Sequence, residues 1–235
     1  MNRETFQKLL KELNLVCDEY KYELLKKYSQ FLLEYNEHTN LTSIKEEQEV
    51  FIKHFYDSLT LTKLIDLDTL NEVLDIGTGA GFPGMVLKIF YPNIKLTLLD
   101  SNNKKTTFLK QLVDYLDLKN VQIINDRAEN LTKTKINYYD LVTARAVANL
   151  RVLSEISIPL VKNNGYFIAL KGINQDEIQG SEKTIEKMSC KITDKICIQL
   201  PNNMGTRTII KIQKYKASDI NKLRPYSKII KSELK

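Results

Sequence analysis

The sequence predicts an α/β fold: a seven-stranded, mostly parallel sheet with helices on both faces, preceded by a helical extension. Three observations predict it. Apolar residues recur at helical spacing over the first 65 residues, and after residue 70 short apolar runs alternate with helix-like stretches. The last two runs are joined by a short segment with Pro, Asn and Gly, 201–205, which is typical of an antiparallel hairpin.

The helical extension is expected in two parts. Apolar residues at three- and four-residue spacing cover residues 19–35, and the pattern returns over residues 46–65. Tyr20, Tyr28 and Phe31 are expected to join the core rather than to form an exposed stacking platform. His54 is interpreted as a packed or capping residue, which is the commoner role of a lone histidine on a helix.

Seven apolar runs are the strand candidates: 73–76, 96–99, 121–124, 141–143, 166–170, 191–200 and 206–213. Helix-like stretches lie between most of them, at about 84–90, 103–117, 149–161 and 173–188. This alternation predicts parallel strands joined by crossover helices. Parallel strands that end in an antiparallel hairpin fit the Rossmann-like sheet of class I methyltransferases better than an all-parallel dinucleotide fold.

Composition places the chain among soluble globular proteins. Its 235 residues suffice for one α/β domain with a small extension, and no apolar stretch is long enough to cross a membrane. The charged N-terminus does not resemble a signal peptide. Three scattered cysteines, Cys17, Cys190 and Cys197, indicate a reducing compartment, so we expect a cytoplasmic protein. No residue pattern has zinc-site spacing, and we expect no metal.

The excess positive charge lies at the C-terminus. Residues 211–235 contain eight basic and two acidic residues, which accounts for the whole net charge of +6. Two interpretations stay open: a frayed, solvated tail, or an arm that contacts phosphates. Tyr215 and Tyr226 among these charges favour the second slightly, because aromatic rings stack on exposed bases.

A glycine-dense loop after the first strand candidate is the sharpest local signal. The run Val-Leu-Asp-Ile-Gly-Thr-Gly-Ala-Gly-Phe-Pro-Gly covers residues 73–84, and a helix is expected to start near Pro83. Gly77 and Gly79 let the backbone turn sharply and let a cofactor approach closely. Residues 79–84 also match the dinucleotide fingerprint G-x-G-x-x-G, a weak signal by itself.

Asp75 decides between the two cofactor classes. A carboxylate near the bound cofactor would oppose the anionic pyrophosphate of NAD, but it would favour the ammonium and sulfonium of S-adenosylmethionine. The single carboxylate of S-adenosylmethionine can meet the N-terminus of the next helix. We therefore expect S-adenosylmethionine as the cofactor.

Two further sites follow the next strands. Asp100, at the end of the second strand, suits hydrogen bonds to ribose hydroxyls, with an ordinary helix cap as the alternative. After the third strand, the backbone amides around Ala128 and Glu129 could read an adenine edge, and a simple polar loop is the alternative.

Together these motifs resemble one family, the 16S rRNA guanine-N7 methyltransferases, also known as glucose-inhibited division protein B. The matching blocks are Asn-Leu-Thr at 40–42, Lys-His-Phe-Tyr-Asp-Ser-Leu at 53–59, the run at 75–84, Leu-Asp-Ser at 99–101, Arg-Ala-Glu at 127–129, Thr-Ala-Arg-Ala-Val-Ala at 143–148 and Leu-Lys-Gly at 170–172. Two departures stand out. Asp126 replaces the family's usual glycine, and residues 222–228 follow the family's basic ending only loosely.

The resemblance implies a function and a set of contacts. It implies methyl transfer to N7 of a guanine in the decoding-region loop of 16S rRNA, with 16S rRNA or the small ribosomal subunit as partner. It implies donor contacts at Gly77, Phe82, Ala128, Glu129 and Arg145. We expect residues 1–65 to form an extension packed on a catalytic domain of residues 66–235 with a basic tail, and we expect a monomer.

Arg145, after the fourth strand, is the candidate catalytic residue. Guanine N7 has a lone pair and no proton to remove, so alignment and water exclusion are the main tasks. We expect Arg145 to contact the donor and to help hold the O6 and N7 edge of guanine; the alternative is an ion pair with a nearby carboxylate. Lys171 could meet RNA phosphate or lie exposed in solvent.

Three other functions stay open. The first is methyl transfer to a non-RNA acceptor, against which the basic tail argues mildly. The second is an RNA-binding or ribosome-assembly module with a dead donor pocket, which the intact Asp75, Asp100 and loop glycines disfavour. The third is a dinucleotide oxidoreductase, which cofactor spectra would reveal.

Overall fold

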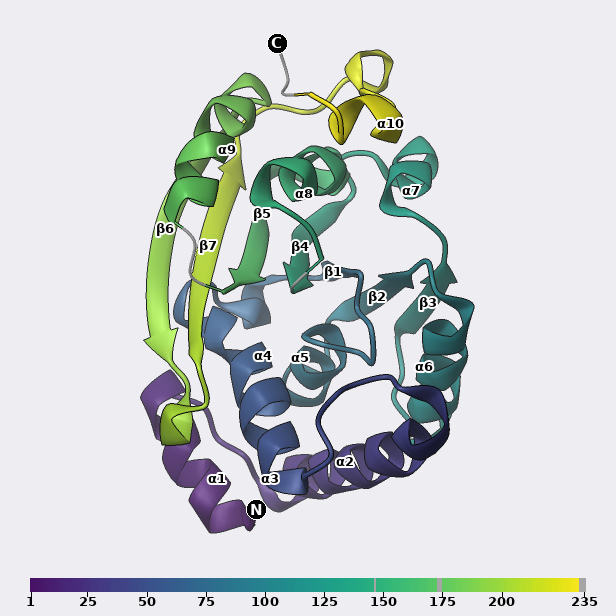
Figure 1. Ribbon diagram of the computed structural model, residues 1–235, viewed down its shortest axis with the longest axis vertical. Coiled ribbons are helices and arrows are strands. Elements are labelled where there is room, and N and C mark those ends of the chain that lie inside the picture. The colour runs from purple at the N-terminus through teal and green to yellow at the C-terminus, as the bar shows by residue number, and fades with distance from the viewer. Residues whose placement is uncertain (146, 173–174, 233–235) are drawn as a thin grey trace.

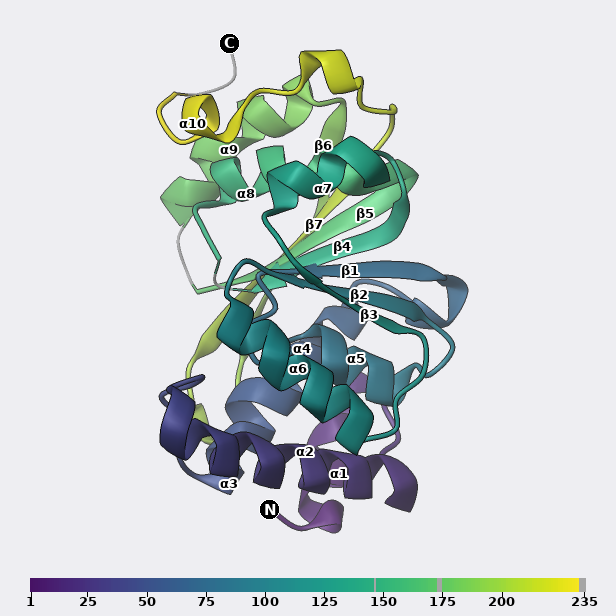
Figure 2. The ribbon, with the colours of Figure 1, turned by 90° about the vertical axis from the view of Figure 1, so that its right-hand side faces the viewer.

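The computed structural model describes residues 1–145, 147–172 and 175–232, and in these residues seven strands form one sheet (Figures 1 and 2). The strand order is β3-β2-β1-β4-β5-β7-β6. The first five strands pair in parallel, whereas β7 runs antiparallel to both β5 and β6. The bounds are β1 Glu72–Ile76, β2 Lys95–Asp100, β3 Val121–Asn125, β4 Tyr139–Arg145, β5 Val161–Lys171, β6 Cys190–Gln199 and β7 Thr206–Lys214. The predicted sheet, including its terminal hairpin, is confirmed.

One strand end differs from the expectation. β5 begins at Val161, five residues before the apolar run that predicted it. Its first residues, 162–164, are polar and exposed, and the pairing of β4 with β5 shifts register between Tyr139 and Leu141. Because residues 162–164 interrupt the apolar pattern, the sequence places Val161 in the preceding helix and residues 162–165 in no element.

The crossover helices lie where the sequence places them, with one addition. They are α5 Gly84–Phe90, α6 Asn103–Tyr115, α8 Leu150–Ser157 and α9 Gln175–Lys187. Residues 173–174 of the expected fourth helix lie outside the described residues. The addition is α7, Ala128–Lys135, which follows β3. Its sequence, Ala-Glu-Asn-Leu-Thr-Lys-Thr-Lys, is mostly polar, which explains why the apolar pattern did not predict it.

The N-terminal segment is helical, as expected. It contains α1 Arg3–Leu10, α2 Glu19–Thr39, and a continuous helical stretch made of α3 Glu47–Glu49, a π-helical segment Val50–Tyr56, α4 Asp57–Leu59 and a 3₁₀ turn Thr60–Lys63. Tyr28 is fully buried and Phe31 packs against the core, as expected. Tyr20 is 69% exposed, so its predicted core position is wrong. It lies in the first turn of α2, where the helix emerges from the packed region.

Two hydrophobic cores lie on opposite faces of the sheet. Val73 and Leu96 point toward α2, α5 and α6, while their neighbours Leu74 and Val142 point toward α7, α8 and α9. Figure 2 shows these two helical layers below and above the strands. Because both faces are covered, the strands read as continuous apolar runs rather than as alternating ones.

Residues 215–232, which make up most of the expected basic tail, are folded rather than frayed. After β7, the chain turns back over α7 and α8 and ends in α10, Tyr226–Ile229 (Figure 1). Lys214, assigned to the basic tail from the sequence, is 1% exposed and belongs to β7. Its ammonium donates to the carbonyl oxygens of Ile158 and Val161 and to Oδ1 of Asn137.

Two structural findings concern membrane-spanning helices and metal sites. Within the described residues, no helix is both long and apolar enough to cross a bilayer. In the same part of the chain, no three His, Cys, Asp or Glu side chains are grouped as a metal site would require.

Candidate active site

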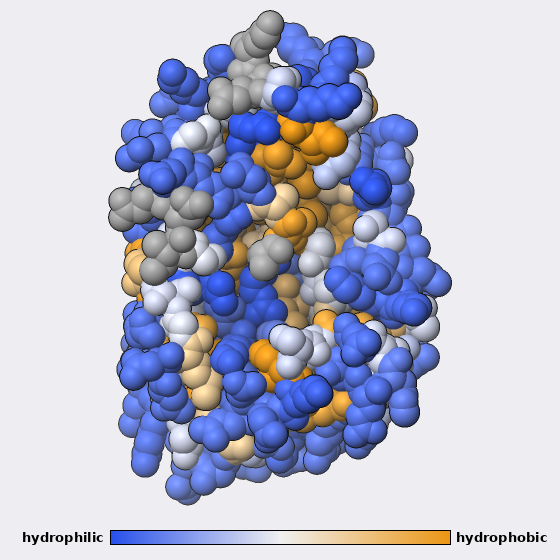
Figure 3. Space-filling view, in the orientation of Figure 1, coloured by the Kyte–Doolittle hydropathy of each residue, from blue (hydrophilic) through white to orange (hydrophobic). Residues whose placement is uncertain are grey.

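The glycine loop lies where the carboxyl ends of three parallel strands meet. Ile76 of β1 pairs with Leu99 of β2 and with Ala144 of β4. In this architecture, ligands bind outside the carboxyl ends of the strands, at the point where the strand order reverses. Figure 3 shows this face, which is hollowed near its middle with hydrophobic surface in and above the hollow.

The backbone of the loop requires its glycines. Gly77 and Gly79 have φ values of +64° and +62°, which L side chains rarely adopt. A Cβ atom on Gly77 would lie 2.6 Å from Cγ2 of Val147, whereas no described atom lies within 4 Å of a Cβ on Gly79. The loop therefore leaves open space beside its own backbone at Gly79.

Asp75 supports this loop from below. Its Oδ2 accepts hydrogen bonds from Oγ1 of Thr78 at 2.6 Å and from the backbone N–H of Gly84 at 2.8 Å. Its Oδ1 is buried and has no hydrogen-bond partner among the described residues. Burial raises the pKa of Asp75 to about 7, against the opposing effect of those two hydrogen bonds. The side chain thus links β1 to α5 and keeps one oxygen unpaired.

Asp100 shapes the same loop from β2. Its Oδ2 accepts from the backbone N–H of Gly79 at 2.9 Å, and its Oδ1 accepts from the backbone N–H of Asn102 at 2.9 Å. The residue that caps α6 is Asn102, whose side chain accepts from Lys104 N, so the cap predicted as the alternative for Asp100 lies two residues later. Asp100 is 6% exposed and stands beside the open space at Gly79.

Ala128 and Glu129 form the first turn of α7, at the end of β3. The first N–H groups of a helix have no intrahelical acceptor, so these amides face outward from the helix end. Asp126, where the resembled family has glycine, accepts from the backbone N–H of Arg127 and from Nδ2 of Asn130. These bonds lower the pKa of Asp126, chiefly through Asn130, and the carboxylate itself builds the turn before α7.

Arg145 ends β4 and is held from several sides. Its Nη1 donates to Oδ2 of Asp57 at 2.9 Å and to the carbonyl of Lys53 at 3.1 Å, and its Nη2 lies 3.0 Å from Nδ1 of His54. Its guanidinium carbon lies 5.0 Å from the centre of the Phe82 ring. The ion pair that was the alternative for Arg145 is therefore present, with Asp57 as the carboxylate.

Phe82 and His54 form a stack beneath this guanidinium. The Phe82 ring lies between His54, at 4.3 Å, and Tyr28, at 5.3 Å between centroids, and both pairs are nearly parallel. The hydroxyl of Tyr28 donates to the carbonyl of Ala80 at 2.5 Å, so α2 is tied to the glycine loop. Phe82 is 4% exposed, and its side chain is committed to this stack.

His54 is held as a neutral ring. Burial is the largest effect and the positive charge of Arg145 adds to it, so the pKa of His54 falls to about 3. Because Arg145 donates to Nδ1, the ring proton belongs on Nε2, which lies 3.1 Å from Oγ1 of Thr42. The expectation that His54 is a packed residue is confirmed. It packs within a strand-end cluster whose members are Tyr28, His54, Asp57, Phe82, Arg145 and Arg207.

Two residues of this cluster escaped the sequence analysis. Asp57 is fully buried, and its carboxylate accepts from Arg207 through Nε at 2.6 Å and Nη2 at 2.9 Å as well as from Arg145. Asp57 stands in the Lys-His-Phe-Tyr-Asp-Ser-Leu block, which was its only signal. Arg207 lies on β7, 150 residues from Asp57, and no local pattern marks it.

Lys171 is not the solvent-exposed residue that one of its two interpretations expected. It ends β5, donates to the carbonyl of Ala148, and pairs with Glu177 at 2.6 Å. Its side chain is 15% exposed. The lysine thus links β5 to the segment before α8 and to the first turn of α9.

The sequence is similar to one curated family. The family model described as rRNA small subunit methyltransferase G matches residues 21–209. Ribosomal RNA small subunit methyltransferase G of Bacillus licheniformis is 43% identical over 217 residues, which cover 91% of both chains. The protein of the same name from Staphylococcus saprophyticus is 48% identical over 189 residues, which cover 80% of this chain and 79% of the relative.

Solved structures share the fold at low sequence identity. The YcgJ protein of Bacillus subtilis aligns with a TM-score of 0.54 at 14% identity, over 70% of this chain and 100% of that one. TYW2 of M. jannaschii in complex with AdoMet aligns with a TM-score of 0.52 at 15% identity, over 64% of this chain and 72% of that one. These likenesses place the sheet and its helices among Rossmann-like methyltransferase folds.

Proposed function

The chain belongs to the rRNA small subunit methyltransferase G family, and from that premise we propose that it transfers a methyl group from S-adenosylmethionine to N7 of a guanine in the decoding-region loop of 16S rRNA. One observation carries the proposal. The glycine loop after β1 and the fixed guanidinium of Arg145 after β4 lie on adjacent parallel strands, at the same edge of the sheet.

The residues present fit S-adenosylmethionine. The donor brings an ammonium and a sulfonium, and Asp75 keeps one buried carboxylate oxygen without a described partner below the loop. The open space beside Gly79 admits a ligand close to the backbone. We propose that Asp75, Gly77, Gly79, Phe82, Asp100, Ala128, Glu129 and Arg145 form the donor site, with Asp75 and Phe82 acting through the loop that they hold in shape.

The proposed chemistry needs no general base. The donor supplies a methyl group that its own sulfonium activates. Guanine N7 offers a lone pair and carries no proton, so the protein has to align the two reactants and exclude water. His54 is consistent with a reaction that needs no general base, because one ring nitrogen accepts from Arg145, the other faces Thr42, and the ring stays neutral.

Arg145 is the proposed catalytic residue. Its contacts with Asp57, Lys53 and His54 fix the plane of the guanidinium, so the group can present its remaining N–H edge without first losing rotamer freedom. Such an edge suits the O6 acceptor of guanine, which leaves the N7 lone pair free to attack the methyl group. We propose that the chain acts as a monomer in the cytoplasm on 16S rRNA or on the small ribosomal subunit.

The test is methyl transfer to a substrate that lacks the modification. Labelled S-adenosylmethionine is incubated with small ribosomal subunits from cells without this protein, and the modified nucleotide is mapped. We expect label on one guanine at N7, lost in Gly77→Asp. The matched control is Gly180→Ala, because Gly180 lies in α9 and no described atom lies within 4 Å of its added Cβ.

Two results would contradict parts of the proposal. Label on protein or small molecules, but not on RNA, would favour a non-RNA acceptor. No binding of S-adenosylmethionine in a direct titration would remove the donor site itself.

A further inference from the structure

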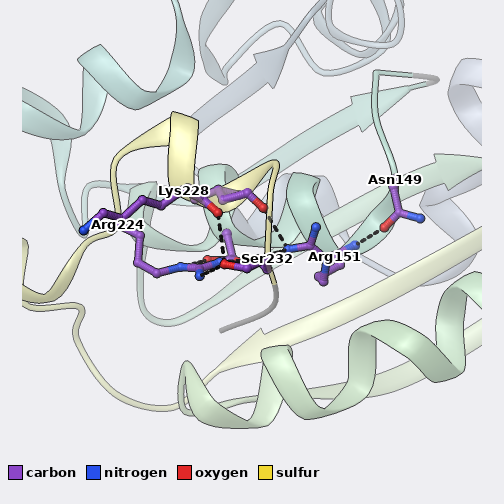
Figure 4. A network of polar contacts seen from close by, with 7 residues as sticks. Asn149, Arg151, Arg224, Lys228 and Ser232 are labelled. Atoms are coloured by element: carbon purple, nitrogen blue, oxygen red, sulfur yellow. Dashed lines mark hydrogen bonds and ion pairs between the residues drawn. The ribbon is translucent and has the colours of Figure 1, made fainter. Parts of the chain in front are cut away.

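The C-terminal segment 215–232 is fastened to the catalytic fold. Arg224 forms a two-pronged ion pair with Glu155 of α8, through Nε at 2.9 Å and Nη2 at 2.8 Å. Arg151, also on α8, donates to the carbonyls of Ile229 and Ser232 at 2.9 Å each. Figure 4 shows Arg151 and Arg224 converging on Ser232. The segment therefore holds a defined position over α7 and α8.

The docked segment, α7, α8 and the turn before β6 line an open cavity of about 850 Å³. Its wall is largely apolar and includes Ile156, Pro159, Leu223 and the ring of Tyr226. The volume falls within the range of about 300–1,000 Å³ that is usual for sites that bind small organic groups.

Exposed lysines surround the apolar wall. Lys133 of α7 and Lys216 and Lys222 of the C-terminal segment line the cavity, and all three are exposed. Of the cavity's three carboxylates, Glu155 pairs with Arg224 and Arg151 and Glu129 pairs with Arg127, so the three exposed lysines outnumber the remaining carboxylate, Asp219. The cavity thus combines an apolar wall with positive charge at its edge, which suits a ligand with an anionic group and a flat apolar body.

The cavity adjoins the proposed donor site. Glu129 and Asn130, in the first turn of α7, line it, and Glu129 belongs to the proposed adenine contact. The guanidinium of Arg127 lies 5.6 Å from the centre of the Tyr226 ring, on the same side of α7. The cavity therefore borders the proposed donor site at the start of α7.

We propose that this cavity binds a nucleotide of the substrate RNA other than the target guanine. Its base packs against Tyr226 and the apolar wall, and its phosphates meet Lys133, Lys216 and Lys222. The inference rests on the proposed function, because it takes the partner to be RNA. Aromatic stacking and exposed lysines are the two means by which proteins hold unpaired nucleotides without reading a duplex.

The first experiment reverses charge at the cavity. Lys216→Glu/Lys222→Glu is compared with Lys228→Glu/Lys231→Glu, which changes two exposed lysines of the same segment that do not line the cavity. Methyl transfer is measured against RNA concentration, and binding of 16S RNA and of S-adenosylmethionine is titrated separately. For the cavity variant we expect KM for RNA to rise at least tenfold, with kcat and donor affinity unchanged. Its salt dependence should weaken by about 1.4 in log–log slope.

The second experiment removes the ring and keeps the charges. Tyr226→Leu retains an apolar side chain at the wall, and we expect RNA to bind about tenfold more weakly, which is the size of one lost base stack. Circular dichroism and the unchanged donor titration establish that each variant is folded.

The outcomes separate the two proposals. Equal effects of both charge reversals, with no effect of Tyr226→Leu, would mean general attraction and would overturn the cavity as a nucleotide site. Methyl transfer that depends on neither pair of lysines would overturn it also, and would leave the cavity to a protein or a small anion. Cavity-dependent RNA binding without methyl transfer would support the cavity and overturn the proposed reaction.

Discussion

Replacing Asp57 with asparagine, which exchanges one carboxylate oxygen for an amide nitrogen, should destabilise the fold more than any other such isosteric substitution in the strand-end cluster. Asp57 is fully buried and stands between two guanidinium groups, Arg145 at 2.9 Å and Arg207 at 2.6 Å. Asparagine keeps the volume, so no cavity forms, but it removes the only carboxylate between these charges in the described structure. One amide N–H₂ must also face a donor.

The magnitude follows from the burial of the three groups. Breaking a buried ion pair costs about 3–5 kcal/mol, because the remaining charge loses its partner. The arginine side chains are 13% and 20% exposed, so water partly replaces the lost carboxylate. We therefore expect the lower value, about 3 kcal/mol, and a fall in Tm of about 6–12 °C for a chain of this size.

The assay is urea denaturation of the wild type, Asp57→Asn, Arg207→Gln and the double variant. A coupling free energy of at least about 1.5 kcal/mol between Asp57 and Arg207 is expected. Each single variant already loses the bidentate contact, so the double variant does not lose it a second time. Asp117→Asn is the control, because its pair with Lys119 lies on the surface, and no measurable change is expected. Coupling below about 0.5 kcal/mol would refute the idea that Asp57 holds the two arginines together.

Three further predictions concern the same cluster. The pKa of His54 is about 3 when folded and about 6.5 when unfolded, so the unfolded state binds more protons between these values and stability falls as pH drops. From pH 7 to 5, urea denaturation should show that the free energy of unfolding of the wild type falls by about 2 kcal/mol relative to that of His54→Gln. Asp75, whose pKa of about 7 makes stability rise as the pH drops, acts equally in both proteins; an unchanged difference would contradict the lowered pKa of His54. Gly77→Ala should destabilise more than Gly79→Ala in thermal unfolding, because both have positive φ but only Gly77 lacks room; equal effects would exclude the clash. Tyr28→Phe should lower stability by about 1 kcal/mol and weaken donor binding in a titration, since the bond to the Ala80 carbonyl is lost; an unchanged donor affinity would separate α2 from the loop.

The architecture was predictable because its signals are local. Each buried strand is a short apolar run. The loop at 77–84 is recognisable from its glycines, which its positive φ values require. The prediction failed where the chain is polar at the surface. α7 has few apolar residues, and residues 162–164 near the start of β5 are exposed. Neither segment therefore shows the apolar periodicity that identifies a helix or a strand.

The site was predictable only in part, for the same reason. Asp75 and Asp100 were found because they lie next to the strand ends that they serve. Asp57 and Arg207 could not be, because Asp57 meets Arg145 from 88 residues before it in the chain, and Arg207 meets Asp57 from another strand of the sheet. A single sequence does not indicate contacts between residues that are far apart in the chain. The resemblance to a family pointed to Arg145 but not to its contact with Asp57.

Charge balance gives the strand-end cluster its chemical character. Two guanidinium groups share the carboxylate of Asp57 and His54 stays neutral, while Asp75, whose pKa Arg145 lowers against the effect of burial, partly offsets the second positive charge. A buried charge of this kind is tolerated when its hydrogen bonds are satisfied, and Lys53 O and His54 Nδ1 satisfy most of those of Arg145. What remains is an oriented positive edge at the end of β4. In the proposed reaction that edge would hold guanine O6, and it would do so without any group that has to change its protonation state.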